Sequence, residues 1–295
     1  MCKPASFVVT KNQVYWSMTT DGHLDIIKEF DIHVDGARGP NAVSVEICPP
    51  NDDYALPLSK WIFATDQDRL PSWYDAKKAE IRTRTELKKW AKAKIIKSGT
   101  RHIKTGVVLF VCGKAVVTVS GNGIVKSVAG NGIVEYVSDN GTVKSVYDNG
   151  KVESVAGNGI VKSVSGNGTV KSVSGNGTVK SVYGNGTVES VYGNGTVESV
   201  YGKGTVKSVY DNGTVKYVHD NGTVKSVSGN GTVEYVSGNG TVKSVYDNGT
   251  VIVYKVKVID PTILKSTTAV MIDRHIKGKA VCYTGKDRKK KAETE

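Results

Sequence analysis

A nine-residue period through the middle of the chain constrains the fold more than any other feature. From Gly121 to Tyr246 the sequence runs as fourteen clean copies of a unit such as Gly-Asn-Gly-Thr-Val-Lys-Ser-Val-Tyr, and a degenerating fifteenth copy covers Asp247 to Lys255. A short, fixed period is the signature of stacked repeats, in which each unit contacts only its neighbours. We number the positions of the unit one to nine, with Gly121 at position one.

The residues of one unit predict a turn followed by a short strand. Positions one to three hold Gly or Asp, then Asn (Lys203 in one copy), then Gly. Asn-Gly is a strong turn signal, since both residues tolerate positive φ. Positions four to nine are rich in Thr, Val and Tyr, which favour extended backbone. We therefore expect positive φ at the Asn-Gly pair and a strand over the rest of the unit.

Two valines occupy positions five and eight of every clean copy, for example Val125 and Val128. Residues three apart lie on opposite faces of a flat strand. A bend near position six would turn both valines inward and leave the charged residue there, such as Lys126, pointing to solvent. Stacked units would then lay valine on valine, about 4.8 Å apart. The sequence thus predicts a mainly β fold, a nonapeptide-repeat β-solenoid or β-helix.

The repeat frame extends more loosely toward the N-terminus. Before the first clean copy, Val116 and Val119 fall on the valine positions, and Val107 and Phe110 fit them one cycle earlier. We therefore expect one continuous solenoid over residues 107 to 254.

Charges at position six probe the number of units per turn, because like charges stacked on neighbouring rungs repel each other. Opposite signs occur more often between units three repeats apart, as for Lys126 and Glu153, than between units two repeats apart. This pattern favours three units per turn over two. The rival geometry is an antiparallel meander with Asp-Asn-Gly hairpin loops, although a single sheet would leave the valines of one face exposed to water.

Composition divides the chain into three parts, residues 1–98, 99–258 and 259–295. The first part holds all four tryptophans and predicts a small α+β domain that covers the first rung. The second part is the solenoid. In the third part, Ala269–Asp273 and Ala280–Tyr283 predict a β-hairpin cap, followed by a basic tail. Solenoids need such caps because the last rung has an unpaired strand edge.

Within residues 1–98, Ser6 to Trp16 predicts a hairpin and residues 42–47 predict an alternating strand. A short helix is expected over residues 21–30, capped by Thr20 or Asp21. A second helix is expected to open at a capping box formed by Ser72 with Asp75. This second helix is expected to contain Ile81, Leu87, Trp90 and Ala91 and to run toward Ile95.

The net charge of +12 is a surplus that can attract nucleic acid or another polyanion. Part of it lies in the C-terminal stretch from Lys286 to Lys291, which predicts a solvated tail. The first residues lack the apolar run of a signal peptide, and no stretch is apolar enough to span a bilayer. The sequence therefore predicts a protein of the cytoplasm or of a virion, with no membrane partner. The four scattered cysteines predict no disulfide framework.

Patterns for catalysis and for metal binding are missing from the sequence. Calcium-binding nonapeptide repeats need Asp at position six, where this chain has Lys or Glu. One N-terminal stretch is crowded with acids and histidines, yet no nucleophile, metal-helix or phosphate-loop pattern accompanies them. We therefore predict a non-catalytic protein without a cofactor or metal site. The crowded residues are Asp21, His23, Asp25, Glu29, His33 and Asp35.

Tyrosines at position nine and lysines at position six recur in the second half of the repeats and form the candidate binding face. Tyrosine rings can stack on bases, sugars or one another, and lysines attract anions. The alternative is that the tyrosines simply stack along the solenoid. The candidate face comprises Lys171, Lys180, Tyr183, Tyr192, Tyr201, Lys207, Tyr210, Lys216 and Lys225.

The Gly-Asn-Gly-Thr-Val-x-x-Val cadence over about residues 103 to 258 resembles the Gly- and Thr-rich passenger repeats of bacterial adhesins and autotransporters, which form β-helices. The opening Met-Cys-Lys-Pro-Ala-Ser and the segment Pro-Ser-Trp-Tyr-Asp from Pro71 look like small uncharacterised proteins of bacteria and their phages. Neither resemblance names a function. From the repeated columns of Lys, Glu and Tyr we expect a structural or interaction protein, a rigid scaffold with a multivalent surface. Its expected partner is another protein or a second copy of itself. The alternative is an electrostatic binder of nucleic acid or another polyanion.

Overall fold

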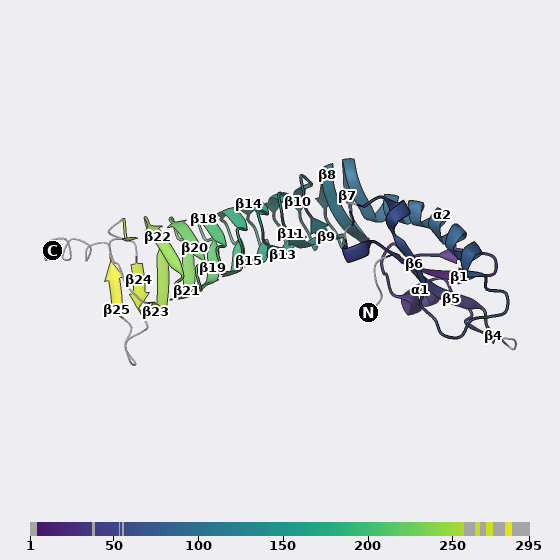
Figure 1. Cartoon of the computed structure of the whole chain (residues 1–295). Helices are drawn as coiled ribbons and strands as arrows, with labels where there is room; N and C mark the ends of the chain where they lie inside the picture. The colour runs from purple at the N-terminus through teal and green to yellow at the C-terminus, as the bar shows by residue number, and fades with distance from the viewer. Residues whose placement is uncertain are drawn as a thin grey trace. The chain divides into compact units, whose positions relative to one another are not determined.

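The computed structural model describes residues 5–36, 39–52, 54, 56–256, 263–265, 270–273 and 281–284. The chain forms two compact units, Met1–Ile96 and Lys97–Glu295 (Figure 1). The predicted loop around Gly278 and the predicted basic tail lie outside the described residues.

The N-terminal unit is an antiparallel sheet with two helices. Its strands are ordered β2-β1-β5-β6, and a separate pair, β3 with β4, forms a two-stranded ribbon. Helix α1 packs Ile26 against Val8 and Ala42, while α2 buries Leu87 and Trp90. The α+β prediction is confirmed, as are the hairpin and the alternating strand. The elements are β1 Ser6–Thr10, β2 Val14–Tyr15, α1 His23–Glu29, β3 Asp35–Gly36, β4 Gly39–Pro40, β5 Ala42–Cys48, η1 Pro50–Asp52, η2 Leu58–Lys60, β6 Ile62–Thr65 and α2 Ala76–Lys94.

Both predicted helix starts need correction. The N-cap of α1 is Gly22, which has no side chain with which to cap the helix. The Thr20 hydroxyl accepts from Gly22 N–H and donates to Asp25. The N-cap of α2 is Asp75, whose carboxylate accepts from Lys78 N–H, so Ser72 does not open that helix.

Helix α2 runs to Lys94, as predicted, and buries one stripe of its surface. Leu87 and Trp90 are buried, but Ile81 is 68% exposed. The buried stripe runs through residues 79, 83, 87, 90 and 94, which follows the helical period of 3.6 residues. Lys94 ends this stripe fully buried, and its ammonium group donates to the Met18 carbonyl at 2.6 Å.

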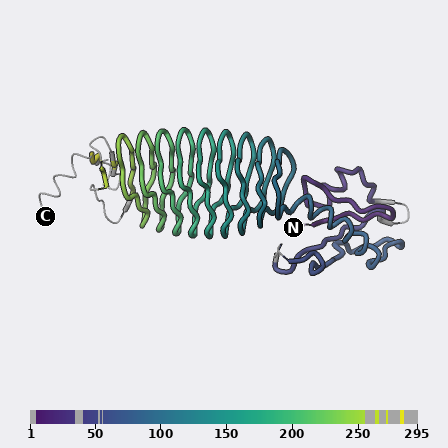
Figure 2. Tube along the Cα trace, turned by 90° about the horizontal axis from the view of Figure 1, so that it is seen from above, coloured from purple at the N-terminus to yellow at the C-terminus, as the bar shows by residue number. Residues whose placement is uncertain are grey.

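The C-terminal unit is a parallel β-solenoid of about nine turns, as predicted (Figures 1 and 2). From β8 to β21, each strand pairs in parallel with the strand two places further along the chain, which rules out the antiparallel meander. The strands are β7 Ile95–Ile103, β8 Val107–Val119, β9 Ile124–Val128, β10 Ile133–Val137, β11 Thr142–Val146, β12 Lys151–Val155, β13 Ile160–Val164, β14 Thr169–Val173, β15 Thr178–Val182, β16 Thr187–Val191, β17 Thr196–Val200, β18 Thr205–Val209, β19 Thr214–Val218, β20 Thr223–Val227, β21 Thr232–Gly238, β22 Thr241–Val245, β23 Thr250–Val256, β24 Val270–Asp273 and β25 Val281–Thr284.

One turn of the solenoid contains two nonapeptides, so the preference for three was wrong. Thr178 pairs with Thr196 and Thr187 pairs with Thr205, so each residue pairs with its counterpart two repeats later. Strands with odd numbers from β9 to β23 form one ladder, the odd ladder, and strands with even numbers from β10 to β22 form the even ladder. The charge signs misled because lysine side chains are long, flexible and solvated, so like charges can stack at little cost.

The core is a column of valines, as the repeat predicts. Every valine at positions five and eight from Val125 to Val233 is fully buried. Both valines of one strand point inward because the residue at position six lies outside the strand pairing. Between β13 and β15, for example, Val161 and Ser163 pair with their counterparts, whereas Lys162 between them does not. The predicted bend near position six therefore lets one five-residue strand contribute two core residues.

The turn differs from its predicted form. Positive φ occurs at position one, with φ near 50–60° at each Gly or Asp there, and not at the Asn-Gly pair. The N–H of position three donates to the carbonyl of position nine, for example Gly177 to Ser174 at 2.8 Å. Glycine is needed at position three for space, because a Cβ at Gly177 would lie 2.5 Å from the Val155 carbonyl oxygen of the rung below.

The first coil of the solenoid is one residue shorter than the extension of the nine-residue repeat toward the N-terminus predicts. Val108 and Val111 pair with Val125 and Val128, so Val107 and Phe110 are not at core positions. Val117 likewise replaces Val116 as the buried residue, with Val116 beside it in the strand. Strand β8 therefore belongs to both ladders. Its first part pairs with β9 and its last part pairs with β10, and no Asn-Gly turn separates the two parts.

The C-terminal end continues both ladders with a different sequence. Strand β24 pairs in parallel with β23, and β25 pairs antiparallel with β24, in agreement with the predicted pair of terminal strands. Leu264 forms a parallel bridge with Val245 of the even ladder. Leu264 and Met271 are almost fully buried, so larger side chains follow the valine column at this end.

Candidate functional site

The outward columns of the solenoid are the largest ordered surface that the repeat creates. Strands of one ladder pair in register, so the same position recurs directly above itself at every second repeat. Neighbouring rungs lie about 4.8 Å apart. Positions four, six, seven and nine therefore form straight columns of side chains outside the valine core.

The candidate binding face divides between the two ladders, because consecutive nonapeptides alternate between them. The two groups are thus not one continuous column. Lys180, Tyr183, Tyr201 and Lys216 belong to repeats of the odd ladder, whereas Lys171, Tyr192, Lys207, Tyr210 and Lys225 belong to repeats of the even ladder.

The tyrosines of position nine stack on one another along each ladder. Tyr183, Tyr201 and His219 form a continuous stack with ring centroids 5.2 Å apart and planes within 7°. Tyr192 and Tyr210 stack in the same way in the other ladder. Each ring inside a stack already has a ring on its face, so the surface available to a partner consists mainly of ring edges and hydroxyl groups.

The even ladder carries a balanced column of charges at position six. The Glu153 carboxylate lies 2.6 Å from the Lys171 ammonium group and 2.9 Å from that of Lys151. Lys207 lies 2.8 Å from Glu189 further along the same column. Two lysines of the candidate face, Lys171 and Lys207, are therefore neutralised by neighbours.

The ion pairs of Glu153 change its acidity. Burial alone would raise the pKa of Glu153, but hydrogen bonds from Lys171 and Lys151 outweigh it and hold the pKa below its ordinary value. In return, the bond from Glu153 raises the pKa of Lys171. Both charges are therefore favoured in the folded state.

The odd ladder carries a run of lysines at position six. Lys126, Lys144, Lys162 and Lys180 occupy position six on four successive rungs, β9, β11, β13 and β15. The last three are exposed, and within the described part of the chain none of those three has a carboxylate within ion-pair distance. We call these four residues the lysine column. Of these four residues, the sequence prediction included only Lys180, because it selected the lysines that accompany the tyrosines in the second half of the repeats.

The crowded acids and histidines of the N-terminal unit do not form one cluster. His23 is buried, and its ring lies beside Asp66, which sequence reasoning did not single out. Asp25 accepts a hydrogen bond from Thr20, and His33 is exposed on the rim of a hollow.

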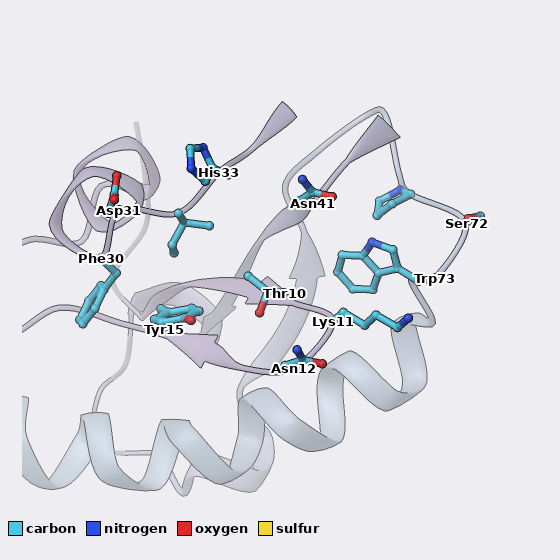
Figure 3. A pocket seen from close by; sticks show the side chains of 12 residues that line it. Thr10, Lys11, Asn12, Tyr15, Phe30, Asp31, His33, Asn41, Ser72 and Trp73 are labelled. Atoms are coloured by element: carbon cyan, nitrogen blue, oxygen red, sulfur yellow. The ribbon is translucent and has the colours of Figure 1, made fainter. Parts of the chain in front are cut away.

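That hollow has a volume of about 570 Å³ and mixes aromatic with polar side chains (Figure 3). Tyr15, Phe30 and Trp73 contribute rings, and Lys11 and Asn12 lie at the hairpin turn beside them. No nucleophile with an adjacent base is among its described lining residues, so its geometry indicates no particular reaction.

Among the described residues, no helix has the length and apolar character needed to cross a membrane. Comparison of the chain with protein-family models, with curated proteins and with solved structures found no match. The resemblance to adhesin and autotransporter passenger repeats therefore depends on the repeat cadence alone.

Proposed function

We propose that this protein is a non-catalytic scaffold whose solenoid presents regular columns of side chains to a protein partner. The observation that supports this proposal is the contrast between inside and outside. Every core valine from Val125 to Val233 is fully buried, whereas position nine varies among Tyr, Ser, Ala and His from rung to rung. Variation limited to outward positions changes the surface without disturbing the fold.

The most distinctive outward feature is the stack of Tyr183, Tyr201 and His219. Tyrosine edges and hydroxyl groups combine apolar contact with hydrogen bonding, which favours protein interfaces. We take a second copy of this chain as the first partner to test, since identical columns can align on one another.

The test is sedimentation velocity over a hundredfold range of protein concentration. The tyrosine-stack variant changes Tyr183, Tyr201 and His219 to Ser, the residue that several other repeats have at position nine. We expect the wild type to associate as its concentration rises and the variant to stay monomeric with an unchanged circular dichroism spectrum. A wild type that remains monomeric throughout, or a variant that associates equally well, would contradict the proposal.

A second candidate function, binding of a polyanion, is favoured by the lysine column. Four ammonium groups at spacings of about 4.8 Å create a local positive potential that a row of phosphates or sulfates can neutralise. Removal of one lysine that binds a phosphate should reduce the slope of log K against log salt by about 0.7–0.9.

Heparin and single-stranded DNA binding should be measured over a salt series. For this function, changing Lys144, Lys162 and Lys180 to Glu should reduce the salt slope by about 2–3. The matched control changes the exposed Lys28, Lys77 and Lys88 to Glu, which alters the net charge equally away from the column. Absence of retention at low salt, or an equal effect of both variants, would remove this function and leave the protein scaffold.

A further inference from the structure

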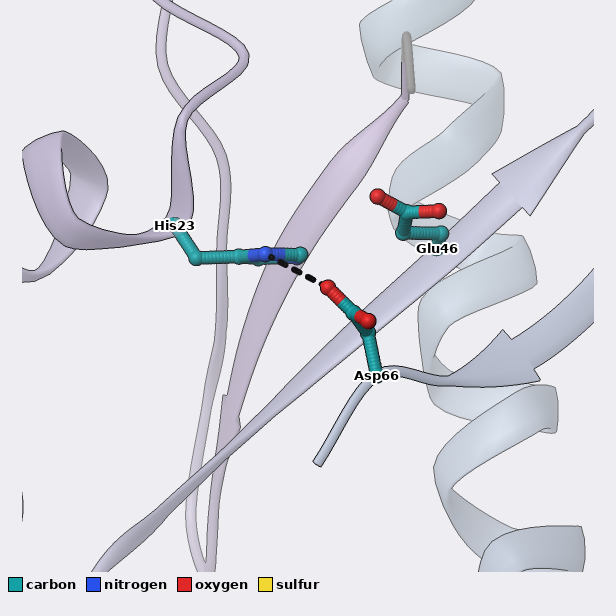
Figure 4. A group of neighbouring side chains, drawn as sticks. All are labelled: His23, Glu46 and Asp66. Carbon is teal, nitrogen blue, oxygen red and sulfur yellow. Dashed lines mark ion pairs between the residues drawn. The ribbon is translucent and has the colours of Figure 1, made fainter. Parts of the chain in front are cut away.

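Three side chains of metal-ligand type meet in the N-terminal unit from separate parts of the chain (Figure 4). His23 is the first residue of α1, Glu46 lies on β5, and Asp66 directly follows β6. One ligand atom from each lies within 4.8 Å of the other two. Asp66 is held in place by its N–H, which donates to the Ser44 carbonyl at 2.9 Å.

The surroundings of the His23 ring determine which nitrogen faces the two carboxylates. Nε2 lies 3.1 Å from the Val45 carbonyl oxygen, which can only accept a hydrogen bond, so Nε2 carries the proton. Nδ1 points toward Asp66. A backbone carbonyl that holds one ring nitrogen and directs the other toward a ligand is the usual arrangement for a metal-bound histidine.

The distance between His23 and Asp66 fits a shared cation better than a direct ion pair. Nδ1 and Oδ2 are 3.4 Å apart, whereas charge-assisted N–H···O⁻ bonds are about 2.7–2.9 Å long. Two ligands bound at about 2.0–2.1 Å to one tetrahedral ion are separated by about 3.3–3.4 Å. An oxygen of Glu46 lies within 4.8 Å of both ligand atoms and supplies a third ligand near the same centre.

The burial of the three side chains leaves the cluster open to solvent on one side. His23 is only 6% exposed, while 56% of the Asp66 side chain is exposed. An ion could thus enter from solvent beside Asp66 and keep a water molecule as its fourth ligand.

We propose that His23 Nδ1, Glu46 and Asp66 bind one divalent transition-metal ion of the Zn²⁺ class. One imidazole with two carboxylates suits Zn²⁺ better than Ca²⁺ or Mg²⁺, which prefer oxygen ligands alone. The ion would join α1, β5 and the residue after β6, so it would stabilise the N-terminal unit. The site is independent of the solenoid and of the proposed function.

Isothermal titration of the full chain with Zn²⁺, and with Mg²⁺ for comparison, tests the site. His23→Gln keeps a donor for the Val45 carbonyl while it removes the Nδ1 ligand, and Asp66→Asn removes a ligand from an exposed position. We expect one Zn²⁺ ion per chain, and we expect each variant to bind at least about tenfold more weakly. Asp68→Asn, an exposed carboxylate two residues from Asp66, is the matched control and should bind as the wild type does.

A thermal unfolding series with and without Zn²⁺ supplies an independent measurement. The ion should raise the melting temperature of the wild type and of Asp68→Asn, but not that of Asp66→Asn. Equal Zn²⁺ affinity of the wild type and Asp66→Asn would overturn the proposal, because the ion would then be bound elsewhere. Absence of Zn²⁺ binding to the wild type would also overturn it and leave a direct contact between the His23 ring and Asp66.

Discussion

The two glycines of each repeat have different physical roles. At position one the backbone has positive φ, which Asp also tolerates, and Asp139 and Asp247 there accept hydrogen bonds from glycine N–H groups of the rung below. At position three the backbone passes close to a valine carbonyl of the rung below, and any side chain would collide with it. This explains why position one alternates between Gly and Asp while position three is always Gly.

Gly177→Ala should lower the free energy of unfolding by about 1–3 kcal/mol, because its Cβ would lie 2.5 Å from the Val155 carbonyl oxygen. Gly175→Asp should change it by less than about 1 kcal/mol, since the strain of positive φ is offset by a new hydrogen bond to the rung below. Urea denaturation followed by circular dichroism measures both. Equal destabilisation by the two variants would show that position three is not limited by space.

At the scale of elements, the ladders determine which charges become neighbours. Glu153 meets Lys171 because both occupy position six on successive rungs of the even ladder. Hydrogen bonds from Lys171 and Lys151 keep the pKa of Glu153 below its ordinary value, despite the opposing effect of burial. The ionised carboxylate therefore stabilises the folded state above its unfolded pKa, and this contribution is lost as pH falls through the folded pKa.

Glu153→Gln should lower stability by about 0.2–1 kcal/mol at pH 7, the usual range for a partly exposed ion pair. The difference from the wild type should stay constant down to about pH 5 and then shrink as acid protonates Glu153 below about pH 4.3. Urea midpoints measured between pH 3 and pH 7 test this. Glu198→Gln, on the odd ladder, is the control. A stability difference between Glu153→Gln and the wild type that grows in acid would contradict a lowered pKa of Glu153.

At the scale of the whole solenoid, two nonapeptides per turn decide which residues share a surface. Equivalent residues two repeats apart are neighbours on one ladder, and those three repeats apart belong to different ladders. The lysine column and the tyrosine stacks both follow from this arrangement. With three units per turn, Lys126 would instead lie beside Glu153, and Tyr183 beside Tyr210.

Paired cysteines can test the number of units per turn. Thr178→Cys with Thr196→Cys places the two Cα atoms about 4.8 Å apart, within the range of about 4.4–6.8 Å that a disulfide needs. This pair should oxidise within one chain, whereas Thr169→Cys with Thr196→Cys, three repeats apart, should not. Peptide mapping after oxidation distinguishes the new bond from the native cysteines, and the reverse outcome would support three units per turn.

The sequence alone determined the solenoid, the places of its turns and strands, and the burial of Val125, Val128 and their counterparts, because these depend on contacts within one repeat and on its period. It did not determine which residue of the turn has positive φ. It also identified the first hairpin and the alternating strand of the N-terminal unit. The cap of α1 was mistaken because the Thr20 hydroxyl contacts Gly22 and Asp25 in the folded chain, and the start of α2 was mistaken because Asp75 itself is the N-cap.

Only the tertiary structure decided which repeats lie side by side. Two inward valines per unit satisfy a coil of two units or of three, and flexible lysines discriminate poorly between them. The lysine column and the division of the candidate face therefore followed from the strand pairing. The approach of His23 to Glu46 and Asp66 is likewise a product of sheet pairing, because residues far apart in the chain meet only when strands and helix pack together.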